Sequence, residues 1–176
     1  INNDKKKSLF IKSYGCQMNE YDSERMAEIL EPLNYFPVSE PGKADLIILN
    51  TCHIREKAAE KIYSELGRIK KINLSSKRDT KIAVAGCVGQ AQGQEIINRA
   101  PMVDLVFGPL TYHQLPEMLE SIKTEKGLPK KRLVNIDVPD VDKFDELKEP
   151  RKSLKSISSL LSIQEGCDKF CSFCVV

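Results

Sequence analysis

The sequence predicts an α/β fold with a mostly parallel open sheet and helices on both of its faces. Short apolar runs alternate with helical patterns over residues 1–138, which is typical of strands joined by helices. Several of the apolar runs end in a small residue followed by a cysteine, which indicates a turn after a strand. The hydrophobic share of 41% and the charged share of 30% are those of a soluble globular protein.

The expected elements follow from these local patterns. Helical spacing of apolar residues predicts helices at residues 19–31, 55–72 and 94–99, and Pro116 opens another that runs to about residue 126. Asp22 and Ser23 are the expected caps of the first helix, and Pro32 ends it. Pro37 places the second strand at an edge of the sheet. Apolar runs predict strands at residues 8–14, 35–38, 44–50, 81–85, 103–107 and 132–136.

Beyond residue 138 the composition changes. Residues 139–156 are rich in Asp, Lys, Glu and Pro, with few apolar anchors, so we expect a linker there. A new strand is expected at residues 159–163. The sequence therefore predicts one domain over residues 1–138 and the start of a second over residues 157–176.

Charge and cysteine content limit the class of protein. A net charge of +2 neither indicates nor excludes a nucleic-acid partner, because a basic patch can lie within a balanced total. Six cysteines without a secretory signal favour metal ligation in a reducing compartment over disulfides, so we expect a cytoplasmic protein. No apolar run approaches the roughly 20 residues that span a bilayer, so no membrane partner is expected.

The last dozen residues hold three thiols in a tight pattern. Cys167, Cys171 and Cys174 are spaced so that one loop can place three sulfurs around one metal centre. Thiolates suit zinc, Cu(I) and iron–sulfur clusters, and a structural zinc site normally has four protein ligands. A four-iron cluster on three thiolates leaves one iron open, which favours catalysis over simple electron transfer. A zinc knuckle or a disulfide loop is the alternative.

Three further thiols occupy equivalent places in the predicted sheet. Cys16, Cys52 and Cys87 lie 36 and 35 residues apart, and each follows the end of an expected strand. Because the carboxyl ends of parallel strands meet at one edge, the three thiols should converge there on a second metal site. Zinc is again an alternative metal, and each cysteine could instead be a small buried apolar residue.

Polar residues beside these thiols have two interpretations each. His53 could be a fourth ligand, although a histidine after a strand more often belongs to the loop itself. Asn19 and Asn50 could shape the metal site or simply cap local backbone.

Three segments around the first cysteines resemble the methylthiotransferases, which are radical S-adenosylmethionine (radical SAM) enzymes. They read YGCQMNEYDS at residues 14–23, LNTCHIREKA at residues 49–58 and AGCV at residues 85–88. The CxxxCxxC pattern of the tail resembles the radical-SAM signature without a gap. The resemblance implies a Rossmann-like N-terminal domain, followed by the first strand and cluster loop of a partial TIM-like barrel.

The resemblance also implies the cofactors and their ligands. Cys167, Cys171 and Cys174 would hold the radical-SAM [4Fe-4S] cluster, whose open iron binds S-adenosyl-L-methionine. Cys16, Cys52 and Cys87 would hold an auxiliary [4Fe-4S] cluster from which sulfur is inserted. We expect no catalytic residues beyond these cluster ligands, because cofactor and cluster carry the chemistry.

Within the family, the residues after Cys16 and Cys52 are similar to those of the branch that acts on tRNA. That branch methylthiolates carbon 2 of the isopentenylated adenosine beside the anticodon, with an external electron donor. A branch that modifies a ribosomal protein and a non-catalytic zinc-binding module are the alternatives. We expect a monomer, and we expect these 176 residues to be inactive alone, because most of the barrel is missing.

Overall fold

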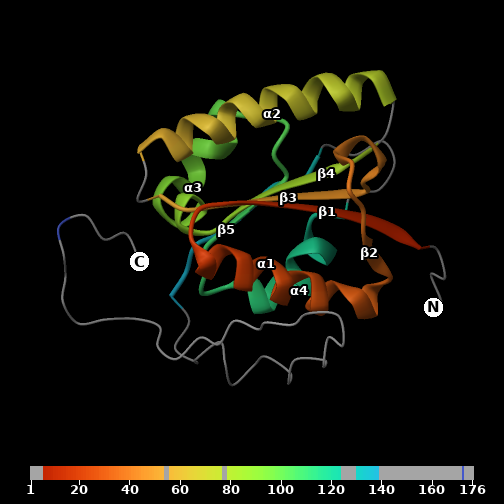
Figure 1. The fold of residues 1–176 in the computed structure, drawn as a ribbon, viewed down its shortest axis with the longest axis horizontal. Helices are drawn as coiled ribbons and strands as arrows, with labels where there is room; N and C mark the ends of the chain where they lie inside the picture. Colours follow the sequence, from red (N-terminus) through yellow and green to blue (C-terminus); the bar gives the residue numbers. More distant parts are fainter. Residues whose placement is uncertain (1–5, 54–55, 77–78, 124–129, 139–171, 173–176) are drawn as a thin grey trace.

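The computed structural model describes residues 6–53, 56–76, 79–123, 130–138 and 172. These residues form a six-stranded sheet in the order β2-β1-β3-β4-β5-β6, in which each neighbouring pair is parallel (Figure 1). The strands are β1 (Lys7–Tyr14), β2 (Tyr35–Pro37), β3 (Leu46–Thr51), β4 (Lys81–Ala85), β5 (Leu105–Phe107) and β6 (Leu133–Asn135). The predicted α/β class and the parallel sheet are therefore confirmed, and β2 lies at an edge as expected.

Helices cover both faces of the sheet. Figure 1 shows α2 (Glu56–Ser76) and α3 (Cys87–Arg99) on one face, and α1 (Gln17–Leu30) and α4 (Leu115–Ser121) on the other. Short 3-10 turns are η1 (Glu31–Leu33), η2 (Pro41–Lys43) and η3 (Tyr112–Gln114). No helix among the described segments is both long enough and apolar enough to cross a membrane.

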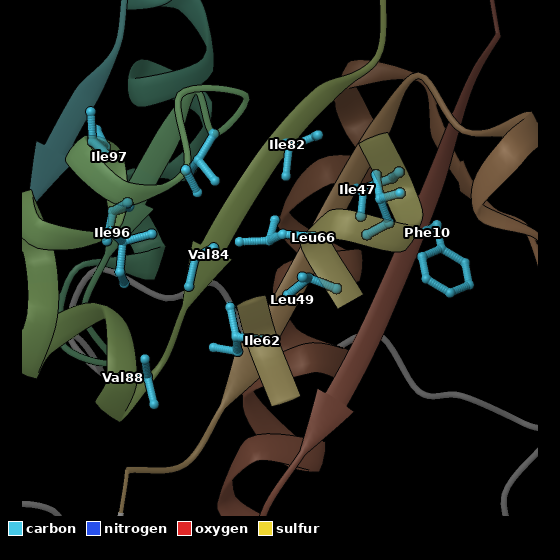
Figure 2. Packing of buried hydrophobic residues seen from close by; sticks show 14 of the residues in the cluster. Phe10, Ile47, Leu49, Ile62, Leu66, Ile82, Val84, Val88, Ile96 and Ile97 are labelled. Atoms are coloured by element: carbon cyan, nitrogen blue, oxygen red, sulfur yellow. The ribbon is translucent and has the colours of Figure 1, made fainter. Parts of the chain in front are cut away.

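The strand β3 lies between two apolar cores, and all six of its residues are buried. Its alternate side chains point to opposite faces, so Ile47 and Leu49 pack under α2 while Leu46 and Ile48 pack under α1. Figure 2 shows the first of these cores, in which a stripe from α2 that includes Ile62 and Leu66 meets the sheet. Both cores hold β3 firmly, and the next residues of the chain lead into the candidate site.

The boundaries of all four α-helices differ from the sequence prediction, three of them by a modest amount. The helix α1 begins at Gln17 and its N-cap is Cys16, so the prediction that Asp22 and Ser23 cap it was wrong. The helix α2 continues to Ser76, beyond the predicted end at residue 72. The helix that was expected to run from Pro116 to about residue 126 ends at Ser121.

The largest difference concerns α3, which begins at Cys87 instead of residue 94. Its backbone kinks at Gly93, where φ is +24°, so the two halves are not one regular helix. Apolar periodicity is visible only after this kink, and glycines in the first half weaken the helical pattern. Cys87 therefore lies in the first turn of a helix and not in a loop.

The second part of the chain is outside the described residues. This applies to the expected linker at 139–156, the strand at 159–163, and Cys167, Cys171 and Cys174. The predicted boundaries at 138 and 156 and the cluster loop therefore remain predictions.

Candidate metal centre

Three neighbouring strands carry Cys16, Cys52 and Cys87 at their carboxyl ends. In the register of the sheet, Tyr14 lies opposite Thr51 and Asn50 lies opposite Ala85. Each cysteine follows one or two residues later. Because neighbouring strands are about 4.8 Å apart, three adjacent strand ends span only about 10 Å. The structure thus brings the three thiols to one edge of the sheet, as the sequence predicts.

This edge is also where the strand order reverses. From β1 the chain adds β2 on one side, and it then adds β3, β4 and β5 in turn on the other side of β1. Ligands of open α/β sheets bind at such a switch point, outside the carboxyl ends of the strands. The position of the three cysteines is therefore the expected position of a functional site in this fold.

The turns that carry the cysteines pack against one another without spare room. A Cβ atom on Gly15 would lie 2.6 Å from the Cβ of Cys52. A Cβ on Gly86 would lie 2.8 Å from the carbonyl oxygen of Thr51. Both contacts are too short for a real side chain, so glycine before Cys16 and before Cys87 allows the three turns to meet.

The pKa of Cys87 reflects this crowding. Burial is the largest effect and the nearby Cys52 thiol adds to it, so the pKa of Cys87 rises to about 11. Smaller increases come from Cys16 and Asp22, whereas a hydrogen bond from the His53 backbone lowers the pKa of Cys87. Cys52 and Cys16 are thus close enough to Cys87 to affect it electrostatically. The contact of His53 with Cys87 that this pKa reflects is made by the His53 backbone.

Two of the thiols lie at helix N-termini. Cys16 is the N-cap of α1 and Cys87 is the first residue of α3. At such positions the backbone N–H groups of the first turn have no partner within the helix and can face a bound negative charge. Cys16 is exposed, Cys87 is half-buried and Cys52 is buried, and none of them forms a disulfide with a described residue. The edge is therefore open on the Cys16 side and closed beneath Cys52.

A buried polar network supports the thiols from the α1 side. The Asn19 side-chain oxygen accepts hydrogen bonds from the Cys16 N–H at 3.3 Å and from the Cys16 Sγ at 3.4 Å. Asn19 Nδ2 donates to Asn50 Oδ1 at 3.0 Å, and Asn50 Nδ2 donates to the Asn19 carbonyl oxygen at 2.8 Å and to Ser23 Oγ at 3.0 Å. Ser23 Oγ lies 2.6 Å from Ser13 Oγ. The interpretation of Asn19 as a cap of α1 is confirmed, and its side chain also contacts the Cys16 thiol.

Sequence reasoning missed the two serines of this network. Ser23 was assigned to a cap, and Ser13 carried no signal because it is an ordinary polar residue within a strand. Their distance from Asn50 in the sequence hides the contact, which only the packing of α1 on β1 and β3 creates.

The chemistry of the donor set is compatible with an iron–sulfur cluster, because thiolates are soft ligands. No group of three or more His, Cys, Asp or Glu side chains within the described segments lies close enough to hold one metal ion. Around zinc, with Zn–S bonds of about 2.3 Å, thiolates would have to approach to roughly 3.8 Å. A four-iron cluster is wider and takes its cysteine ligands at separate corners. Three soft thiolates at adjacent strand ends are ligands that an iron–sulfur cluster can use.

Comparison with known proteins gives the family. Residues 8–108, which include Cys16, Cys52 and Cys87, match the family described as "Uncharacterized protein family UPF0004". The chain belongs to this family. UPF0004 is the N-terminal domain of MiaB-type methylthiotransferases, so the family predicted from the sequence is confirmed.

Three curated proteins that are similar to the chain share one name. Proteins called "tRNA-2-methylthio-N(6)-dimethylallyladenosine synthase" are similar to it in Cereibacter sphaeroides (57% identical), Ruegeria pomeroyi (56%) and Ehrlichia canis (54%). Each match covers 97% of this chain and 37% of the relative. The chain thus spans just over a third of the length of these relatives, and the similarity extends beyond the residues of the family match.

Proposed function

We propose that this chain is the auxiliary-cluster part of a cytoplasmic tRNA methylthiotransferase of the radical-SAM class. The intact enzyme would methylthiolate carbon 2 of an isopentenylated adenosine beside the anticodon. The observation that carries the proposal is the convergence of Cys16, Cys52 and Cys87 at three adjacent strand ends. The shared name of the relatives supports the choice of tRNA over a ribosomal protein.

The residues would divide the work between two centres. Cys16, Cys52 and Cys87 would hold an auxiliary [4Fe-4S] cluster at the sheet edge. Cys167, Cys171 and Cys174 would hold the radical-SAM cluster and, through it, S-adenosyl-L-methionine. When bound, these groups supply the radical, sulfur and methyl chemistry of methylthiolation, with electrons from an external donor.

The chain's own contribution at the first centre is to place and shield its ligands. Cys52 is only 4% exposed, so water has little access to its sulfur. The N-termini of α1 and α3 present N–H groups near Cys16 and Cys87, which would offset the negative charge of ligating thiolates. The exposed side at Cys16 would leave access for a tRNA base, and a base in the single-stranded anticodon loop can be turned out of its stack.

The metal part of the proposal is tested by iron and acid-labile sulfide per chain after anaerobic reconstitution. The parent is compared with a variant in which Cys16, Cys52 and Cys87 are all changed to Ala. About eight irons falling to about four, or about four falling to none, would support a cluster at the sheet edge. Bound zinc without iron in the parent would contradict it and favour a zinc-binding module.

The substrate part needs the longer enzyme. A hybrid would be built in which this chain replaces the matching segment of the Cereibacter sphaeroides relative. We expect the hybrid, given S-adenosylmethionine and a reductant, to form the methylthiolated nucleoside in isopentenylated tRNA, detected by mass spectrometry. Modification of ribosomal protein in place of tRNA would overturn the assignment, and the same hybrid with Cys52→Ala is the control.

A further inference from the structure

The pair Asn19 and Asn50 lies directly beneath the thiols and is almost completely buried. Asn19 is 3% exposed and Asn50 is 0% exposed. They come from different elements, α1 and β3, and lie 31 residues apart in the sequence. We propose that the pair is a positioning clamp, which sets the separation of the Cys16, Cys52 and Cys87 turns before any metal binds. This inference rests on the proposed function only for the identity of the cluster that the thiols would hold.

Backbone groups at both ends fix the direction of the hydrogen bonds in this clamp. The Cys16 N–H can only donate, so the Asn19 oxygen must face it. The Asn19 carbonyl can only accept, so the Asn50 nitrogen must face it at 2.8 Å. These two orientations leave Asn19 Nδ2 facing Asn50 Oδ1, so the hydrogen bond between them can run only in this direction. Neither amide can be turned over without facing donor to donor or acceptor to acceptor.

The clamp contacts all three cysteine turns. Asn19 Oδ1 binds both the backbone and the sulfur of Cys16. Asn50 lies on β3 two residues before Cys52, so the second turn continues directly from the clamp. On the third side, the backbone of Gly86 packs against Asn50, because a Cβ there would lie 2.4 Å from Asn50 Oδ1. One pair of side chains therefore determines how closely three separate turns approach.

An amide pair suits this task better than an apolar pair of similar size. A buried amide costs free energy unless its hydrogen bonds are made, so the pair tolerates only arrangements in which all partners are in place. Apolar contacts would allow the turns to slide by a fraction of an ångström. A cluster with ligands from three turns needs those positions fixed, and second-layer hydrogen bonds commonly provide this.

The test uses Asn50→Asp, which keeps the shape of the side chain and removes its two N–H donors. Cys167, Cys171 and Cys174 are changed to Ser in every variant, so that only the sheet-edge thiols react. The matched control is Asn135→Asp. Asn135 likewise donates through Nδ2, at 2.9 Å to Gln114, but it lies on β6 at the far edge of the sheet.

Two readouts are compared under conditions where urea denaturation shows each variant to be folded. The first is bridging of thiol pairs in metal-free protein by dibromobimane, with the bridged peptides identified by mass spectrometry. The second is the half-time of iron loss to a chelator after reconstitution. For Asn50→Asp we expect at least a tenfold fall in bridging of Cys16 to Cys52 and at least a tenfold shorter half-time. For Asn135→Asp we expect less than a twofold change in either.

The outcomes separate the clamp from the proposed function. If Asn50→Asp lowers stability but changes bridging and iron loss less than twofold, the pair is only a stabilising contact and the clamp is refuted. If the parent binds no iron but Asn50→Asp still loses bridging, the result supports the clamp and contradicts the proposed cluster. If Asn50→Asp does not fold, Ser23→Ala replaces it. That variant removes a single acceptor of Asn50, and a roughly threefold fall in bridging is expected; no fall refutes the clamp.

Discussion

Replacing Gly86 by alanine should strongly destabilise the domain, because two separate costs meet at this residue. Its backbone has φ +84° and ψ −162°, a region that essentially only glycine occupies and that costs about 1–3 kcal/mol for other residues. The new Cβ would also lie 2.4 Å from Asn50 Oδ1 and 2.8 Å from the Thr51 carbonyl oxygen. Overpacking of this kind costs about 1–3 kcal/mol, so Gly86→Ala should lose about 4 kcal/mol in total.

The assay is urea and thermal denaturation of the metal-free chain, with unfolding monitored by circular dichroism. A loss of about 4 kcal/mol is a large part of the 5–15 kcal/mol typical of a domain, and it should lower the Tm by roughly 10–20 °C. The matched control is Gly67→Ala in α2. No atom lies within 4 Å of a Cβ built there, so alanine should stabilise the helix by about 0.5–1 kcal/mol. A loss below about 1 kcal/mol for Gly86→Ala, or an equal loss for Gly67→Ala, would refute the reasoning.

Two other predictions concern ionisable groups, of which Cys87 is half-buried and Asp104 is fully buried. Because burial and then Cys52 raise the pKa of Cys87 to about 11, the folded metal-free chain holds this proton more tightly than the unfolded chain, whose thiol has a pKa near 8.5. The stability that Cys87 contributes should therefore be lost as the pH rises from about 9 through 11. The urea midpoint of the parent should fall over this range, and the midpoint of the Cys87→Ala variant should fall less. An identical fall in both proteins would contradict the raised pKa of Cys87. Asp104 is fully buried, lies 2.7 Å from Lys130 and accepts the Ile82 N–H, so Asp104→Asn should cost about 1–3 kcal/mol in urea denaturation. The exposed pair Glu40 and Lys43 is the control, since Glu40→Gln should change stability by less than about 0.5 kcal/mol, and equal losses would count against a special role for Asp104.

The sheet could be predicted from the sequence because its signals are local. Each strand is an apolar run closed by a small or polar residue, and burial on both faces leaves such runs uninterrupted, as in β3. The convergence of Cys16, Cys52 and Cys87 followed from the same signals, since the position of a residue after a parallel strand determines the edge at which it lies. These features needed no knowledge of contacts between distant residues.

The start of α3 and the support of the thiols could not be predicted, for different reasons. Glycines around Cys87 weaken the helical pattern, and the kink at Gly93 breaks its period. Cysteine is not among the common N-cap residues, so Cys16 gave no signal as a cap. The contacts of Asn50 with Asn19 and Ser23 depend on how α1 packs on the sheet, and neither propensity nor spacing in the sequence encodes that packing.

The distribution of the thiols over three strand ends has a consequence for how the protein matures in the cell. In the newly made chain Cys16, Cys52 and Cys87 are separated by 36 and 35 residues, so no two of them are neighbours before the sheet forms. An iron-delivery protein that meets the nascent chain at the ribosome would find only scattered thiols at this centre. Cys167, Cys171 and Cys174, by contrast, lie within a few residues of one another in any conformation. Loading of the proposed cluster at the carboxyl ends of the strands would therefore follow folding. A defect that slows pairing of β1, β3 and β4 would leave these cysteines exposed to oxidation during that delay.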